Sequence, residues 1–172
     1  MKASGGKVSI SRRELEFLLA CETTGRERFL VLGLLSRHFA TALWSNEKDE
    51  RLTEVHYYGY ADYYKQMPHI FHDAKINLNI TLRVIQTGIP LRVLDVMGCG
   101  GFVLTNYREE IAEHFVNGVE CVIYEDIEDM YAKAQYYLGH DTERRQIAAN
   151  GLAKVQRDFT FEQALTGMLG AE

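Results

Sequence analysis

Arg92 and Asp95 are charged residues in an otherwise apolar segment, and they follow Gly88, Ile89 and Pro90 in the stretch TGIPLRVLDVMGCGGF. Pro90 suits the first turn of a helix, because its backbone angle φ is already helical. The first amides and the positive dipole end of such a helix attract anions, and Gly88 lets a phosphate come close to the backbone. Arg92 adds a forked guanidinium that suits phosphate, and Asp95 offers a carboxylate that can hold a ribose. The stretch therefore predicts a diphosphate site at a helix that begins between residues 88 and 91.

Two simpler interpretations of this stretch stay open. Arg92 and Asp95 lie three residues apart, a spacing at which opposite charges pair on a helix surface. The run GCGG at 98–101 is typical of a helix C-terminus followed by a tight turn into a strand. It does not match the dinucleotide-binding fingerprint, and the chain contains no Walker A pattern.

Apolar segments of strand length and strand composition recur along the chain from residue 39 onwards. They cover residues 39–45, 55–60, 75–80, 101–106 and 120–124. Helical patterns lie between several of them, at 62–72, 90–98 and 107–116. This alternation predicts a doubly wound, Rossmann-like α/β domain with a mainly parallel sheet over residues 39–172. Ligands bind such sheets outside the carboxyl ends of the strands, which directs attention to the loops 45–54, 59–62, 81–90, 105–109 and 124–128.

The segment before this domain is predicted to be helical. Residues 1–10 are small and polar and predict a flexible lead-in. A helical segment over 11–38 is expected to pack on the domain, with Ser11 and Glu14 at the spacing of a capping box. The residues TTGRE at 23–27 predict a break that divides it into two helices.

Helical spacing returns in the C-terminal third of the chain. Apolar residues recur on one helix face from Ile127 to Leu138, and a charged helix is expected from about Thr142 to Arg157. Thr160 begins a last helix with a second capping-box spacing. The domain is therefore expected to end in C-terminal helices.

Composition excludes several classes of partner. The chain has 172 residues, 47% of them hydrophobic, and a net charge of −5, without the basic surface that nucleic-acid binding needs. No run of about 18 apolar residues predicts a membrane span. Three scattered cysteines predict neither a disulfide framework nor a zinc site, and they favour a cytoplasmic location.

Aromatic and acidic clusters offer weaker indications of a site. Five tyrosines could stack on a nucleobase or pack half-buried on a strand and a helix, and they are Tyr57, Tyr58, Tyr60, Tyr63 and Tyr64. Tyr60 follows Gly59 at the end of a strand and is the best candidate of the five for a nucleobase. His69 and His72 have no third ligand at a sensible spacing, and the acidic run YEDIED suits a helix start, so no metal site is predicted.

Residues 55–165 resemble the C-terminal, sugar-donor-binding domain of group 1 glycosyltransferases, in particular the spore-maturation type. The motifs that carry the resemblance are GYADY, INLNIT, GIPLRVLD, GCGGF and FVNGVE, in this order. The segment GIPLRVLDVMGCGGF is the specific part. The resemblance implies half of a GT-B enzyme, in which two Rossmann-like domains enclose the active site and transfer a sugar, of hexosyltransferase type, from a nucleotide diphosphate sugar.

The same resemblance assigns roles to individual residues. Asp95 matches the acidic position that holds the ribose of the nucleotide sugar. Gly88 and Ile89 match the backbone that meets the diphosphate, and Tyr60 matches the loop near the base. Arg92 belongs to the subfamily's own motif and is expected at the phosphates. Arg83, in the loop 81–90, is a second candidate cation for the leaving diphosphate, and no metal cofactor is expected.

The sequence also departs from the wider class. The first of its two glutamates falls on Thr87, whose hydroxyl cannot supply the charge of a carboxylate, and the second is shortened to Asp95. The acceptor-binding N-terminal domain has no counterpart here, so a partner domain or subunit is expected and this domain is predicted to be inactive alone. Catalytic residues stay unassigned. The alternatives are a nucleotide-binding module without transferase activity and an α/β domain that binds protein.

Overall fold

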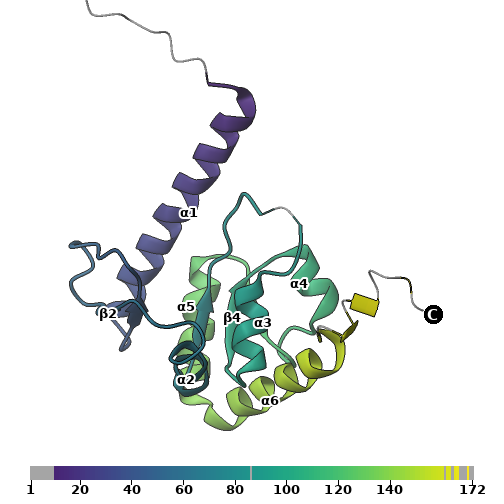
Figure 1. The fold of residues 1–172 in the computed structure, drawn as a ribbon. Coiled ribbons are helices and arrows are strands. Elements are labelled where there is room, and N and C mark those ends of the chain that lie inside the picture. The colour runs from purple at the N-terminus through teal and green to yellow at the C-terminus, as the bar shows by residue number, and fades with distance from the viewer. Residues whose placement is uncertain (1–9, 86, 161, 164, 167–169, 171–172) are drawn as a thin grey trace, which may run out of the picture.

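The computed structural model describes residues 10–85, 87–160, 162, 163, 165, 166 and 170. Figure 1 shows a mixed α/β fold with a long first helix whose N-terminal turns stand away from the rest of the chain. The elements are α1 (Arg12–Ser36), β1 (Ala42–Trp44), β2 (His56–Gly59), α2 (Met67–Asp73), β3 (Asn77–Asn79), α3 (Leu91–Gly98), β4 (Val103–Asn106), α4 (Glu109–His114), β5 (Val122–Tyr124), α5 (Ile127–Gly139) and α6 (Asp141–Asp158).

Helix α1 is continuous, so the predicted break at residues 23–27 is wrong. The expected capping box starts it, with the Ser11 hydroxyl accepting from the Glu14 amide and the Glu14 carboxylate accepting from the Ser11 amide. Thr23 and Thr24 donate their hydroxyls to carbonyls one turn back, so neither side chain competes with the helix. Thr24 is also fully buried against the domain. Packing therefore outweighs the cost of Gly25, which is about 1 kcal/mol in a helix.

The strands form two parallel sheets where the sequence predicts one. Strands β3, β4 and β5 pair in that order, with Leu78 opposite Leu104 and Leu104 opposite Val122. Strands β1 and β2 pair only with each other among the described residues. Their residues are exposed or half-buried, whereas every residue of β5 is buried. The three-stranded sheet therefore forms the centre of the fold.

Helices cover both faces of this sheet, as a doubly wound fold requires. Leu104 and Val122 face a cluster that includes Val31 of α1 and Met130 of α5. The alternate residues of the strands, such as Val103, face a second cluster built from α2, α3, α4 and α6. In the first cluster, Val31 and Leu35 from the C-terminal half of α1 pack on the domain.

The GCGG run is a helix end and a tight turn, as its simpler interpretation predicts. The amide of Gly101 donates to the carbonyl of Val96, and that of Gly100 to Met97, a pattern that ends helices. A Cβ atom on Gly101 would lie 2.4 Å from the carbonyl oxygen of Phe71. Glycine is needed here because α2 packs directly on this turn, which fixes where β4 begins.

The C-terminal third is helical as expected, in α5 and α6. Thr160 and Gln163 make the reciprocal hydrogen bonds of the second predicted capping box, and much of the helix expected after it lies outside the described residues. The predicted lead-in also lies outside them, except for Ile10. All three cysteines are free. Within the described part of the chain, no helix has the length and apolar character to cross a membrane.

Candidate functional site

Polar side chains meet at the carboxyl edge of the three-stranded sheet, where a parallel α/β fold binds its ligands. Asn79 at the end of β3 donates to the hydroxyls of Thr81 and Thr105, at 2.9 Å each. Asn106, at the end of β4, accepts from the amide of Thr81 at 2.9 Å. These bonds fix how the loop after β3, which is called the β3–α3 loop below, leaves the sheet.

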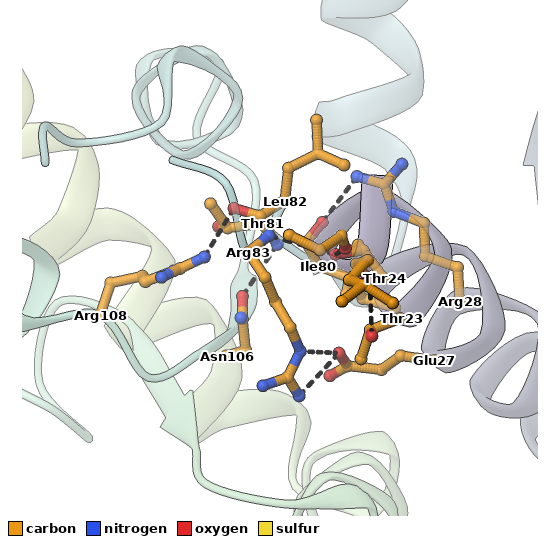
Figure 2. Close-up of polar contacts among 12 residues, drawn as sticks. Thr23, Thr24, Glu27, Arg28, Ile80, Thr81, Leu82, Arg83, Asn106 and Arg108 are labelled. Atoms are coloured by element: carbon orange, nitrogen blue, oxygen red, sulfur yellow. Dashed lines mark hydrogen bonds and ion pairs between the residues drawn. The ribbon is translucent and has the colours of Figure 1, made fainter. Parts of the chain in front are cut away.

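Helix α1 holds the same loop from its other side, as Figure 2 shows. The Arg83 amide donates to the Thr24 hydroxyl at 3.1 Å, and the Arg83 guanidinium pairs with Glu27 at 3.1 Å. Arg28 donates to the carbonyl oxygen of Ile80 at 2.7 Å. The side chain of Glu27 is only 14% exposed. Arg83, predicted as a phosphate-binding cation, is thus neutralised by a partly buried carboxylate of α1.

The turn after β4 and the first turn of α4 each contact the β3–α3 loop. Arg108 donates from Nη2 to the carbonyl oxygen of Leu82 at 2.6 Å, and Figure 2 shows it opposite α1 across the loop. Glu110 accepts a hydrogen bond from the Gly88 amide through Oε1 at 3.0 Å. The Glu110 carboxylate therefore accepts the hydrogen bond of the Gly88 amide, which was predicted to meet a phosphate.

The predicted backbone site has the conformation that the sequence suggests. Gly88 has φ of +91°, a region that side chains rarely adopt, and the position of an added Cβ has no atom within 4 Å. Thr87 is exposed, and Ile89 packs beneath it against the cluster that contains Val93. Helix α3 begins at Leu91, inside the predicted range. Open space thus lies beside the Gly88 backbone.

Asp95 is half-buried on α3 and accepts a hydrogen bond from the hydroxyl of Tyr63 at 2.8 Å. This hydrogen bond, with a smaller contribution from burial, raises the pKa of the Tyr63 phenol above its usual value. The phenol therefore stays protonated and donates. A hydroxyl is also the group that a ribose would present to this carboxylate, so Tyr63 makes the contact that a nucleotide was predicted to make.

Arg92 lies against α2. Its Nη1 is 3.7 Å from the sulfur of Met67, and its guanidinium carbon is 5.2 Å from the centre of the Phe71 ring. Arg92 and Asp95 make no ion pair with each other, although both belong to the described residues. The interpretation of a simple helix-surface pair is therefore wrong, and Arg92 rests on an aromatic face.

The tyrosine cluster is more exposed than a packing role predicts. Tyr60 is 70% exposed and Tyr64 is 85% exposed, and Tyr58 stacks on Trp44 at 4.9 Å between ring centres. Only Tyr57 of the five is half-buried. Tyr60 remains available at the carboxyl end of β2, as the base-stacking prediction requires.

A hollow among the described residues lies elsewhere. Its volume is about 430 Å³, and residues of the loop between β1 and β2, such as Lys48 and Thr53, line it. It contains none of the predicted site residues. We favour the carboxyl edge as the candidate site, because parallel α/β sheets bind their ligands outside the carboxyl ends of the strands. The described residues contain no group of three His, Cys, Asp or Glu side chains placed to hold a metal ion.

The predicted site residues therefore occupy four places. Asp95 and Arg92 face the segment from Tyr63 to Phe71, and Gly88 meets Glu110. Arg83 pairs with α1, and Tyr60 lies exposed directly after β2. Tyr63, Glu110 and Arg108 were missed as site residues. The loop rule had indicated 105–109 without singling out a residue, whereas no local pattern pairs Glu27 with a residue 56 positions away.

Solved structures share this fold. Sucrose-phosphate synthase from Thermosynechococcus elongatus superimposes with a TM-score of 0.68 at 13% identity, over 86% of this chain and 42% of that one. Anabaena Alr3699/HepE, solved in complex with UDP and glucose, gives 0.66 at 14% identity, over 84% and 45%. The C-terminal domain of the glycosyl transferase group 1 protein LpcC from Francisella tularensis gives 0.62 at 15% identity, over 81% and 82%. This chain thus has the α/β fold found in GT-B glycosyltransferases.

Sequence comparison gives the family. Spore protein CgeB of Bacillus subtilis (strain 168) is 30% identical over 109 residues, which are 63% of this chain and 32% of that protein. This chain thus spans about a third of the length of that curated relative. The family model described as "Glycosyl transferase-like" matches residues 12–170. The chain belongs to this glycosyl transferase-like family, as a domain of the group 1 C-terminal type.

Proposed function

We propose that this chain binds the nucleotide diphosphate sugar of a glycosyltransferase reaction. The observation that carries the proposal is the Gly88 amide, which already binds a carboxylate at the carboxyl edge of the parallel sheet. A diphosphate oxygen is an acceptor of the same charge sign and accepts from the same backbone donor. The related fold of Alr3699/HepE, solved with UDP and glucose, supports this choice of ligand.

Asp95 holds the ribose in this proposal. Its carboxylate accepts the Tyr63 hydroxyl in the structure, and it would accept ribose hydroxyls when Tyr63 gives way. Tyr60, exposed at the end of β2, is placed to stack on the base. The chemistry assigned to this domain is electrostatic, because backbone donors and a guanidinium stabilise the charge that develops on the departing nucleotide diphosphate without a metal ion.

Sugar transfer by this chain needs a second, acceptor-binding domain in our proposal. The chain matches 42% and 45% of two solved neighbours but 82% of an isolated C-terminal domain. The exposed surface around Thr87 and Gly88 would then be one wall of the active site. We further propose that the protein acts in the cytoplasm, with free cysteines as found here.

The test is isothermal titration of the protein with UDP, GDP, ADP and inorganic pyrophosphate in the presence of a chelator. We expect saturable binding of one nucleotide without metal. Asp95→Ala should weaken binding of that nucleotide by about tenfold and binding of pyrophosphate by less than about twofold, because only the nucleotide has a ribose. Asp73→Ala, which removes an exposed aspartate at the end of α2, is the matched control.

Two outcomes would contradict the proposal. Absence of binding by all three nucleotides would remove the assignment of a nucleotide site. Equal weakening of nucleotide and pyrophosphate by Asp95→Ala would leave the site in place but show that Asp95 does not hold the ribose.

A further inference from the structure

We propose that Arg108 is the side chain that recognises the phosphates of the nucleotide sugar, in place of Arg83. This inference rests on the proposed function and concerns the same carboxyl edge of the sheet. None of the motifs that carry the resemblance to group 1 glycosyltransferases includes this residue.

Arg83 is poorly available for a phosphate. Its guanidinium donates from Nε and Nη2 to the same Glu27 oxygen, at 3.3 and 3.1 Å, and its amide is bound to Thr24. Turning toward a ligand would leave the carboxylate of Glu27, which is 14% exposed, without its cation. A partly buried charge that loses its partner is destabilising, so the pair favours its present arrangement.

Arg108 differs from Arg83 in its partners. It forms no ion pair with any carboxylate in the described part of the chain. Its Nε is buried without a hydrogen-bond partner, one of two such side-chain atoms found among the described residues. Buried donors are nearly always satisfied, so the Nε of Arg108 is a donor whose hydrogen-bonding capacity is unused in this structure. A phosphate supplies both the acceptors and the charge.

The position of Arg108 links it to the Gly88 amide. Arg108 holds the carbonyl of Leu82 at one end of the β3–α3 loop, and Glu110, two residues later, holds the amide of Gly88 at the other. A diphosphate that replaces the Glu110 carboxylate on Gly88 therefore arrives beside the turn that carries Arg108. In this arrangement Glu110 competes with the phosphate and Arg108 attracts it.

The experiment compares Arg108→Gln with Arg83→Gln, which makes the same substitution in the β3–α3 loop that Arg108 contacts. Each variant is titrated with the nucleoside diphosphate that the wild type binds and with the corresponding nucleoside. Arg108→Gln should weaken binding of the diphosphate by about tenfold and binding of the nucleoside by less than about twofold. Arg83→Gln should change both affinities by less than about threefold. Thermal unfolding shows that each variant is folded.

A second pair of variants keeps the inference falsifiable if Arg108→Gln does not fold. Arg108→Lys retains the charge but not the forked donor geometry, so it should lose less diphosphate affinity than Arg108→Gln does. Glu110→Gln removes the competing carboxylate charge and should strengthen diphosphate binding by about threefold or more, with nucleoside binding unchanged.

The inference is overturned if Arg108→Gln weakens nucleoside and diphosphate equally, because the role would then be structural. It is also overturned if Arg83→Gln has the larger effect on the diphosphate, or if Glu110→Gln weakens diphosphate binding. A wild type that binds nucleotides while Arg108→Gln binds them unchanged removes only this inference. A wild type that binds no nucleoside diphosphate removes the proposed function and this inference with it.

Discussion

The two ends of the β3–α3 loop differ in how strongly they are held. The end near β3, from Ile80 to Arg83, exchanges hydrogen bonds with α1, with Asn106 at the end of β4 and with Arg108 in the turn after it. The end near α3, at Thr87 and Gly88, is exposed, and Glu110 provides its one side-chain hydrogen bond among the described residues. One loop thus joins a fixed end to an end whose contact can be exchanged.

This difference separates support from recognition. At the fixed end, the bonds of Thr24, Asn106 and Arg28 to the loop backbone are partly buried, and Arg83 is matched by Glu27, so an anionic ligand gains little by replacing them. The bond from Arg108 to Leu82 is the exception, because Arg108 has no carboxylate partner among the described residues. The contact at Gly88 is exposed and uses a carboxylate, which an anionic ligand can replace at small cost. A site built in this way keeps its geometry in the absence of ligand and still releases its binding groups.

Breaking the fixed end should give the largest effect. Thr24→Val keeps the volume of a fully buried residue but leaves the amide of Arg83 without its acceptor. We expect a loss of about 2 kcal/mol in the free energy of unfolding, measured by urea denaturation. Thr23→Val is the matched control, because Thr23 makes the same bond within the helix but is exposed, and it should cost less than about 0.5 kcal/mol. Equal losses would mean that the bond to Arg83 contributes little.

Changing the backbone of the exposed end should give a smaller loss. Gly88→Ala forces alanine into φ of +91° without a steric clash, which should cost about 1 kcal/mol of stability. Gly25→Ala, in α1, adds a methyl group that meets nothing within 4 Å and should raise stability by about 1 kcal/mol. The midpoint temperatures of thermal unfolding of the two variants should therefore shift in opposite directions from that of the wild type. A shift of the same sign in both would contradict the glycine assignment at residue 88.

The smallest effect of the three is expected from Tyr63, the residue that contacts Asp95. Tyr63→Phe removes the hydroxyl that occupies this carboxylate and should strengthen binding of a ribose-containing ligand by about threefold, with little change in stability. Titration with the bound nucleotide measures the change, and Tyr64→Phe at the exposed neighbour is the control. Weaker binding in Tyr63→Phe would make Tyr63 a ligand-binding residue and not a competitor.

Local pattern predicted most of the fold. The five apolar segments became β1 to β5, because strands in parallel sheets leave short apolar runs. Helices α3 and α4 formed close to their expected bounds, whereas α2 begins at Met67, five residues after the predicted start at 62. The break in α1 was wrong because burial of Thr24 depends on residues far along the chain. The separation of β1 and β2 from the central sheet was missed because strand composition does not specify pairing partners.

The site was predicted only where a residue acts through its own backbone or its family motif. Gly88 has the conformation that its glycine implies. The ribose-binding role of Asp95 stays a prediction, because the hydroxyl that it accepts in the structure is that of Tyr63. The partners of Arg83 and Arg92 come from α1 and α2, at sequence separations where spacing carries no information. For this reason the sequence could name cations but not tell which of them is neutralised.

The continuity of α1 has a mechanical consequence. A helix of 25 residues is a rod roughly 37 Å long, and a joint at residues 23–27 would have let its two halves tilt independently. Without such a break, the outer turns of α1 belong to the same continuous helix as Thr24, Glu27 and Arg28, which contact the loop. The leucines exposed on these outer turns are Leu15, Leu18 and Leu19. A force applied to those leucines is therefore transmitted along the helix to the loop that leads to Gly88.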